Sequence, residues 1–83
     1  PPALLMQQME WREALEEIDG VEALEDLLDE VAAEKKRCLA LIAQQIDSEK
    51  NAQTANTTAQ ALLFIDKFMI ELTRKLEQLE DAS

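Results

Sequence analysis

The sequence predicts an all-α fold: a three-helix antiparallel bundle in which a short first helix packs on a long hairpin of helices two and three. Good helix formers (Leu, Ala, Glu, Gln and Lys) dominate the 83 residues. The single glycine lies at a predicted turn and both prolines lie at the N-terminal end, so nothing interrupts long helices. Runs of β-branched and aromatic residues of strand length are missing.

The predicted first helix runs from about Ala3 to Ile18 and carries apolar side chains on two faces. At about 100° per residue, one stripe has the spacing of a core face; it consists of Leu4, Trp11, Leu15 and Ile18. Leu5, Met6 and Met9 point away from that stripe by roughly 110–150° or more. They share their side of the helix with Glu10, Arg12, Glu13, Glu16 and Glu17. A second apolar face on a surface helix usually contacts another molecule.

The predicted second helix follows a stop at Asp19-Gly20 and runs from Val21 to about Gln45 or Asp47. Its seam has the alternating three- and four-residue spacing of a bundle, over Val21, Leu24, Leu28, Val31, Lys35, Cys38, Ile42 and Gln45. Further apolar residues widen the predicted seam, namely Leu27, Ala32, Leu39, Leu41 and Ile46. We interpret the lone Cys38 as a small buried thiol. Lys35 is expected to extend its charge to solvent.

The predicted third helix follows a polar turn over residues 47–51 and ends near Leu79. Its core stripe consists of Thr58, Leu62, Ile65, Met69, Leu72, Leu76 and Leu79. Phe64 lies about 110° from the centre of that stripe, so it is either boundary core or part of a second apolar face. Leu63 and Ile70 lie further round and are candidates for contact with a missing domain or a second copy. The domain is thus expected at residues 3–80, with a linker remnant at 1–2 and a tail at 81–83.

Composition excludes several classes of function. Acidic residues outnumber basic ones 18 to 8, which gives a net charge of −10 and disfavours nucleic acid and anionic membrane surfaces as partners. No apolar run reaches the ~18 residues of a spanning helix, and no signal-peptide pattern is present. Without His or Tyr, and with one Cys and one Gly, catalytic triads, Cys/His zinc sites and glycine-rich phosphate loops are impossible. We expect no concave pocket, no cofactor, no metal and no enzymatic activity.

Two motifs resemble a known family. The segment LLMQQMEWREALEEI at residues 4–18 resembles the helix that opens the C-terminal domain of HscB-type J-protein co-chaperones of iron–sulfur cluster assembly. In that family a pattern close to L-M-x-Q-L/M-E-x-R-E-x-L-x-E opens a three-helix domain. The later segment LLFIDK at residues 62–67 resembles the family's L-x-F-[LI]-D-K motif. Together, in this order and spacing, they account for the whole chain as that domain.

The resemblance implies a bacterial cytoplasmic protein that binds the IscU-type scaffold, on which the cluster is built, and delivers it to a dedicated Hsp70-class ATPase. Carried over by motif, the apolar scaffold-binding residues are Leu5, Met6, Met9 and Phe64, and the charged ones are Glu10, Arg12, Glu13 and Glu17. Met9 stands where the family often has Leu, and Trp11 replaces a usual aliphatic core residue. The family's J-domain carries a His-Pro-Asp signature, and this chain has no His. We therefore expect no stimulation of the ATPase by this chain alone.

Two alternatives stay open at this stage. The bundle is either a docking domain or a structural module that self-associates through the same apolar patch. A lipid-binding helix is disfavoured because such helices are usually basic. For Arg12 we prefer an intrahelical pair with Glu16, four residues on, over a role in an interface.

Overall fold

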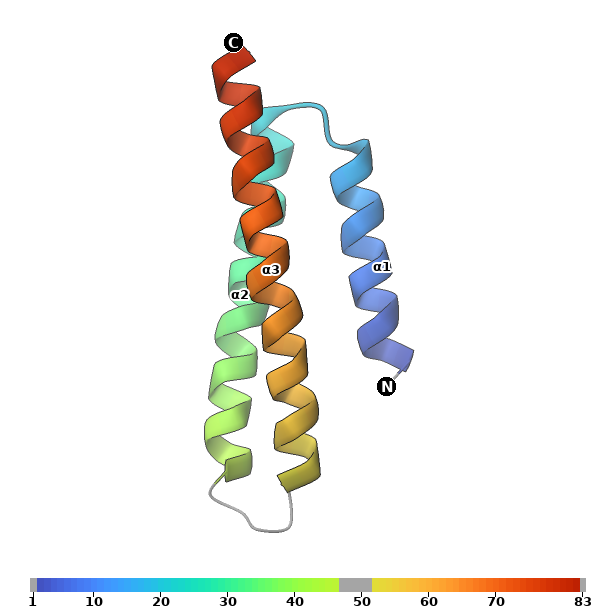
Figure 1. Cartoon of the computed structure of the whole chain (residues 1–83), viewed down its shortest axis with the longest axis vertical. Helices are drawn as coiled ribbons and strands as arrows, with labels where there is room; N and C mark the ends of the chain where they lie inside the picture. Colours follow the sequence, from blue (N-terminus) through green and yellow to red (C-terminus); the bar gives the residue numbers. More distant parts are fainter. Residues whose placement is uncertain (1, 47–51, 83) are drawn as a thin grey trace.

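A computed structural model describes residues 2–46 and 52–82. It contains three helices, α1 (Pro2–Glu17), α2 (Val21–Ile46) and α3 (Ala52–Ala82), and no strand within the described ranges. The helices α2 and α3 run side by side as a long hairpin, and α1 lies along only the part of it nearer the C-terminus (Figure 1). The predicted all-α, three-helix antiparallel bundle with a short first helix is confirmed.

Two predicted boundaries differ from the structure. The helix α3 continues to Ala82, three residues beyond the predicted end at Leu79. The helix α1 begins at Pro2, one residue before the predicted start at Ala3, and the missing amide hydrogen of proline is tolerated at this position. Hydrophobic spacing locates the packed part of a helix and leaves its terminal turns undetermined. The predicted turn over residues 47–51 lies outside the described residues.

The core is centred on Phe68 of α3, which is fully buried. Its ring stacks on Trp11 of α1 at 5.9 Å and on Phe64 at 5.5 Å between centroids. The core stripe predicted for α3 does not include Phe68, although this residue lies three residues after Ile65 and four before Leu72. In the structure α3 packs against both other helices, so its apolar arc is broader and includes the aromatic residues that face α1.

Four residues of the predicted seam of α2 are buried, Leu24, Val31, Cys38 and Gln45, and so is Leu27, one of the residues predicted to widen it. Buried Gln45 has a partner, since its side-chain oxygen accepts a hydrogen bond from the Thr58 hydroxyl at 3.0 Å.

The prediction that further apolar residues widen this seam is wrong for three of them, since Ala32, Leu39 and Ile46 are exposed. Leu39 and Ile46 retain 51% and 68% of their surface. With α1 covering only part of the hairpin, α2 has too few neighbours to bury so wide an apolar arc. None of the described helices is both long enough and apolar enough to span a bilayer.

Candidate protein-binding face

Three apolar side chains lie on the outward face of α1, and we call them the outer patch. Leu5, Met6 and Met9 keep 59%, 60% and 54% of their surface exposed. The prediction from helical spacing that they point away from the core is therefore confirmed. On the opposite face of the same helix Trp11 is buried against the hairpin. The helix α1 thus uses one face for the core and presents the other to solvent.

Acidic side chains follow the outer patch along α1. Glu10, Glu13 and Glu17 are all exposed, and none of them forms an ion pair with another described residue. Their negative charge is therefore not paired within the described chain; it begins beside the apolar side chains at Glu10 and continues along α1 to Glu17. Such a surface suits a partner that has basic groups around an apolar contact.

Phe64, also predicted for the binding site, lies mainly inside the bundle. It is half-buried, and its ring stacks on Phe68 at 5.5 Å and on Trp11 at 6.4 Å between centroids. Of the two interpretations left open by its helical position, the boundary-core one describes the structure. A part in binding stays a prediction for the edge of the ring that solvent can reach.

Arg12 forms a contact that the sequence did not indicate. Its guanidinium donates to both carboxylate oxygens of Glu71 in α3, at 3.1 and 3.5 Å. The same group lies over the rings of Phe64 and Phe68, with Cζ 5.8 and 5.7 Å from their centroids. The preferred interpretation, an intrahelical pair with Glu16, is therefore wrong. Helical spacing compares only neighbours on one helix, whereas Glu71 lies 59 residues further along the chain.

Two lysines also link helices. The Lys75 ammonium donates to the Leu15 carbonyl oxygen at 2.6 Å, in the last turn of α1, where carbonyl groups lack helical partners and the helix dipole favours a cation. The Lys35 ammonium of α2 forms an ion pair with the Asp66 carboxylate of α3 at 2.8 Å. From the sequence, this charge is expected to extend into solvent without a partner. Both contacts join residues too distant in sequence for periodicity to find.

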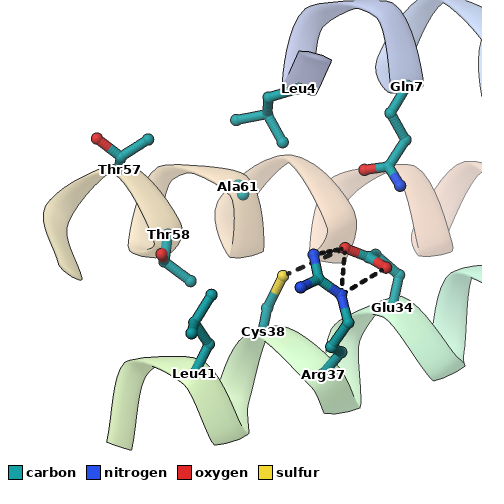
Figure 2. A pocket seen from close by; sticks show the side chains of 9 residues that line it. All are labelled: Leu4, Gln7, Glu34, Arg37, Cys38, Leu41, Thr57, Thr58 and Ala61. Atoms are coloured by element: carbon teal, nitrogen blue, oxygen red, sulfur yellow. Dashed lines mark hydrogen bonds and ion pairs between the residues drawn. The ribbon is translucent and has the colours of Figure 1, made fainter. Parts of the chain in front are cut away.

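A hollow of about 300 Å³ lies where α1 begins, between all three helices (Figure 2). Its lining consists of Leu4, Gln7, Glu34, Arg37, Cys38, Leu41, Thr57, Thr58 and Ala61. The expectation that three packed helices leave no concave site is wrong, because α1 begins here, part of the way along the hairpin, and leaves the rest of the hairpin uncovered. Sequence reasoning missed the hollow, since no residue pattern marks the level at which one helix begins beside another.

The ionisable side chains that line the hollow are Glu34, Arg37 and Cys38. Hydrogen bonds from the Arg37 guanidinium to Glu34, including one at 3.1 Å, keep the pKa of the Glu34 carboxyl below its usual value, so it stays a carboxylate. Burial and the nearby Glu34 charge raise the pKa of the Cys38 thiol. Cys38 retains only 4% of its surface, which confirms a small buried thiol. Within residues 2–46 and 52–82, no three His, Cys, Asp or Glu side chains are grouped to hold a metal ion.

Comparison with known proteins places these features in a family. The family described as "HSCB C-terminal oligomerisation domain" matches residues 1–73. A relative from Burkholderia mallei (strain SAVP1) is 39% identical over 82 residues, covering 95% of this chain and 46% of the relative. Another, from Shewanella sp. (strain MR-4), is 43% identical over 86 residues, covering 96% and 47%. Both are named "Co-chaperone protein HscB homolog".

The chain thus spans about half the length of the curated relatives that it matches. No solved structure matches it.

Proposed function

Because the chain belongs to the HscB family through its C-terminal domain, we propose that it binds the IscU-type scaffold protein of iron–sulfur cluster assembly. The observation that carries the proposal is the outer patch, Leu5, Met6 and Met9, exposed on α1 beside acidic residues that are not paired within the described chain. In this role the chain is a co-chaperone domain without enzymatic activity. Its curated relatives are bacterial, which supports a place in the bacterial cytoplasm.

The size of the patch sets how much affinity it can supply. Fully burying one such side chain is worth roughly 1.5–3 kcal/mol. Since each keeps only 54–60% of its surface exposed, the three together can contribute about 2.5–5 kcal/mol. Micromolar affinity needs about 8 kcal/mol net of the association cost. The surrounding contacts, including those of the acidic residues, must therefore supply a large share.

Glu10, Glu13 and Glu17 would contribute part of that share by attracting basic residues of the scaffold. Charges on a protein surface mainly set orientation and the association rate, and salt screens them. We therefore expect the affinity for the scaffold to fall as ionic strength rises.

The direct test is a calorimetric titration of the purified chain with an IscU-type scaffold. We expect Leu5→Ala and Met9→Ala each to weaken binding by about 5- to 30-fold, which corresponds to roughly 1–2 kcal/mol. Helix content should stay unchanged in both, because neither side chain is part of the core. Leu39→Ala is the matched control, since Leu39 is 51% exposed on α2. Unchanged affinity in both patch variants would remove the proposal.

Phe64→Ala should also weaken binding, but with a second effect that the patch variants lack. Because Phe64 stacks on Trp11 and Phe68, its removal should lower the thermal midpoint as well. Comparing the two readouts separates a contact with the scaffold from support of the surface that the scaffold contacts.

Delivery to an Hsp70-class ATPase would require a J-domain, whose His-Pro-Asp signature this chain does not contain, since it has no His. We therefore propose that the chain contributes scaffold binding alone. An ATPase assay with the dedicated Hsp70 should show no stimulation by the isolated chain.

A second candidate function is self-association. It is favoured by the matched family's description as an oligomerisation domain and by exposed Leu63 and Ile70 on α3, which keep 62% and 53% of their surface. A net charge of −10 on each copy opposes such contact. Self-association should therefore strengthen with salt, whereas scaffold binding should weaken. Sedimentation velocity at several protein and salt concentrations distinguishes the two.

A further inference from the structure

We infer that Arg12 acts on the binding face from within the domain, as a positioning residue held by Glu71, and does not contact the scaffold itself. This inference rests on the proposed function. It changes the role that the family resemblance implies for Arg12, and it adds Glu71, which no sequence motif singled out, to the residues that determine binding.

The guanidinium of Arg12 is engaged on two sides. Two nitrogens reach the two oxygens of Glu71 at 3.1 and 3.5 Å, the paired geometry in which arginine binds carboxylate most specifically. The rings of Phe64 and Phe68 lie within 6 Å of the same group, close enough for attraction between a cation and the ring faces. A scaffold carboxylate that used the same paired geometry would have to displace Glu71 from these two nitrogens.

This contact lies where it can orient the outer patch. Met9 stands three residues before Arg12 and Leu5 seven before it, so all three side chains occupy one flank of α1. Trp11, the adjacent residue, is buried against Phe64 and Phe68. Joining Arg12 to α3 therefore fixes how α1 is turned on the hairpin, and with it the direction of Leu5 and Met9.

Other basic residues differ from Arg12 in this respect. Lys67 and Arg74 on α3 are exposed and form no ion pair with the described residues. Two exposed residues of α3 supply matched controls: Arg74 carries the same charge as Arg12, and Glu77 carries the same charge as Glu71.

The test compares single variants with a charge exchange. Arg12→Gln and Glu71→Gln are titrated with the IscU-type scaffold beside the controls Arg74→Gln and Glu77→Gln. Acrylamide quenching of Trp11, the only tryptophan, reports how closely α1 packs on the hairpin without scaffold. The exchange variant, Arg12→Glu with Glu71→Arg, restores an ion pair in the opposite sense and is compared with Arg12→Glu alone.

We expect both single variants to weaken binding to a similar extent, about three- to tenfold, from the loss of one partly exposed ion pair and its ring contacts. Trp11 quenching should increase in both, neither control should change either readout, and the exchange should recover most of the affinity that Arg12→Glu loses. Retained affinity in Glu71→Gln beside weakened Arg12→Gln overturns the inference, as does an exchange variant no better than Arg12→Glu. If the wild-type chain fails to bind any scaffold, the proposed function fails. Unchanged quenching in both single variants then overturns the positioning role separately.

Discussion

Replacing Phe68 should cost far more stability than replacing Phe64, although only Phe64 belongs to a recognisable motif. Phe68 is fully buried and contacts two aromatic rings. Truncating a buried phenylalanine to alanine costs about 3–5 kcal/mol. Phe64 is half-buried, so its truncation leaves a smaller cavity that solvent partly fills. We expect about half that cost, roughly 1.5–2.5 kcal/mol, for Phe64→Ala.

The whole domain limits how these costs can be measured. At roughly 0.05–0.15 kcal/mol per residue, a chain of 83 residues has about 4–12 kcal/mol of stability. Phe68→Ala would remove a large fraction of it and leave the variant close to unfolding. Phe68→Leu keeps most of the buried volume and should lose only about 1–2 kcal/mol. Urea unfolding followed by far-ultraviolet circular dichroism measures this cost, with Phe64→Leu as the matched control.

The comparison of the two leucine variants tests the packing around Phe68. If Phe64→Leu lowers the unfolding free energy as much as Phe68→Leu does, the core is not centred on Phe68 and the described packing of α1 is wrong. An unchanged slope of the free energy with urea would show that both variants still unfold from a similarly compact state.

Two further predictions concern polar contacts. Lys75→Met should destabilise the domain by about 0.5–1.5 kcal/mol, because the Leu15 carbonyl oxygen loses its donor; thermal unfolding measures this, with the exposed Lys67→Met as control. Glu34→Gln should destabilise the domain by about 1 kcal/mol at neutral pH, because the hydrogen bond from Arg37 favours the carboxylate. Since the pKa of Glu34 is lower in the folded state, this stability is present above the unfolded pKa and lost as pH falls through the folded one. Equal destabilisation at neutral and strongly acidic pH would contradict that linkage.

The sequence predicts those features that depend on one helix at a time. Spacing along α1 correctly separated buried Trp11 from exposed Leu5 and Met9, because a helix fixes the angle between its own side chains. It missed features that depend on how helices are set against each other. Phe68 is central only because α3 faces two neighbours, and the Arg12–Glu71 pair joins residues 59 apart. A single sequence carries no signal for the ion pair, whereas Phe68 has the helical spacing of a core residue, three residues after Ile65 and four before Leu72.

The distribution of charge along the bundle indicates how the scaffold would be oriented along α1 in the proposed binding. No Asp, Glu, Lys or Arg occurs in residues 1–9, 38–46 and 51–65, whereas residues 47–50, between the last two stretches, include three. The described parts of the three uncharged stretches lie toward the end of the molecule where α1 begins and the hairpin extends beyond it (Figure 1). Acidic residues dominate the opposite end, and the outer patch lies at the boundary, since Met9 is followed by Glu10. Glu17 stands eight residues after Met9, about 12 Å further along the helix axis, which exceeds the screening length of about 8 Å at physiological salt. A scaffold whose apolar contact covers Met9 can therefore attract Glu17 only if its basic groups extend toward the acidic end of the bundle. This requirement fixes the direction in which the scaffold lies along α1.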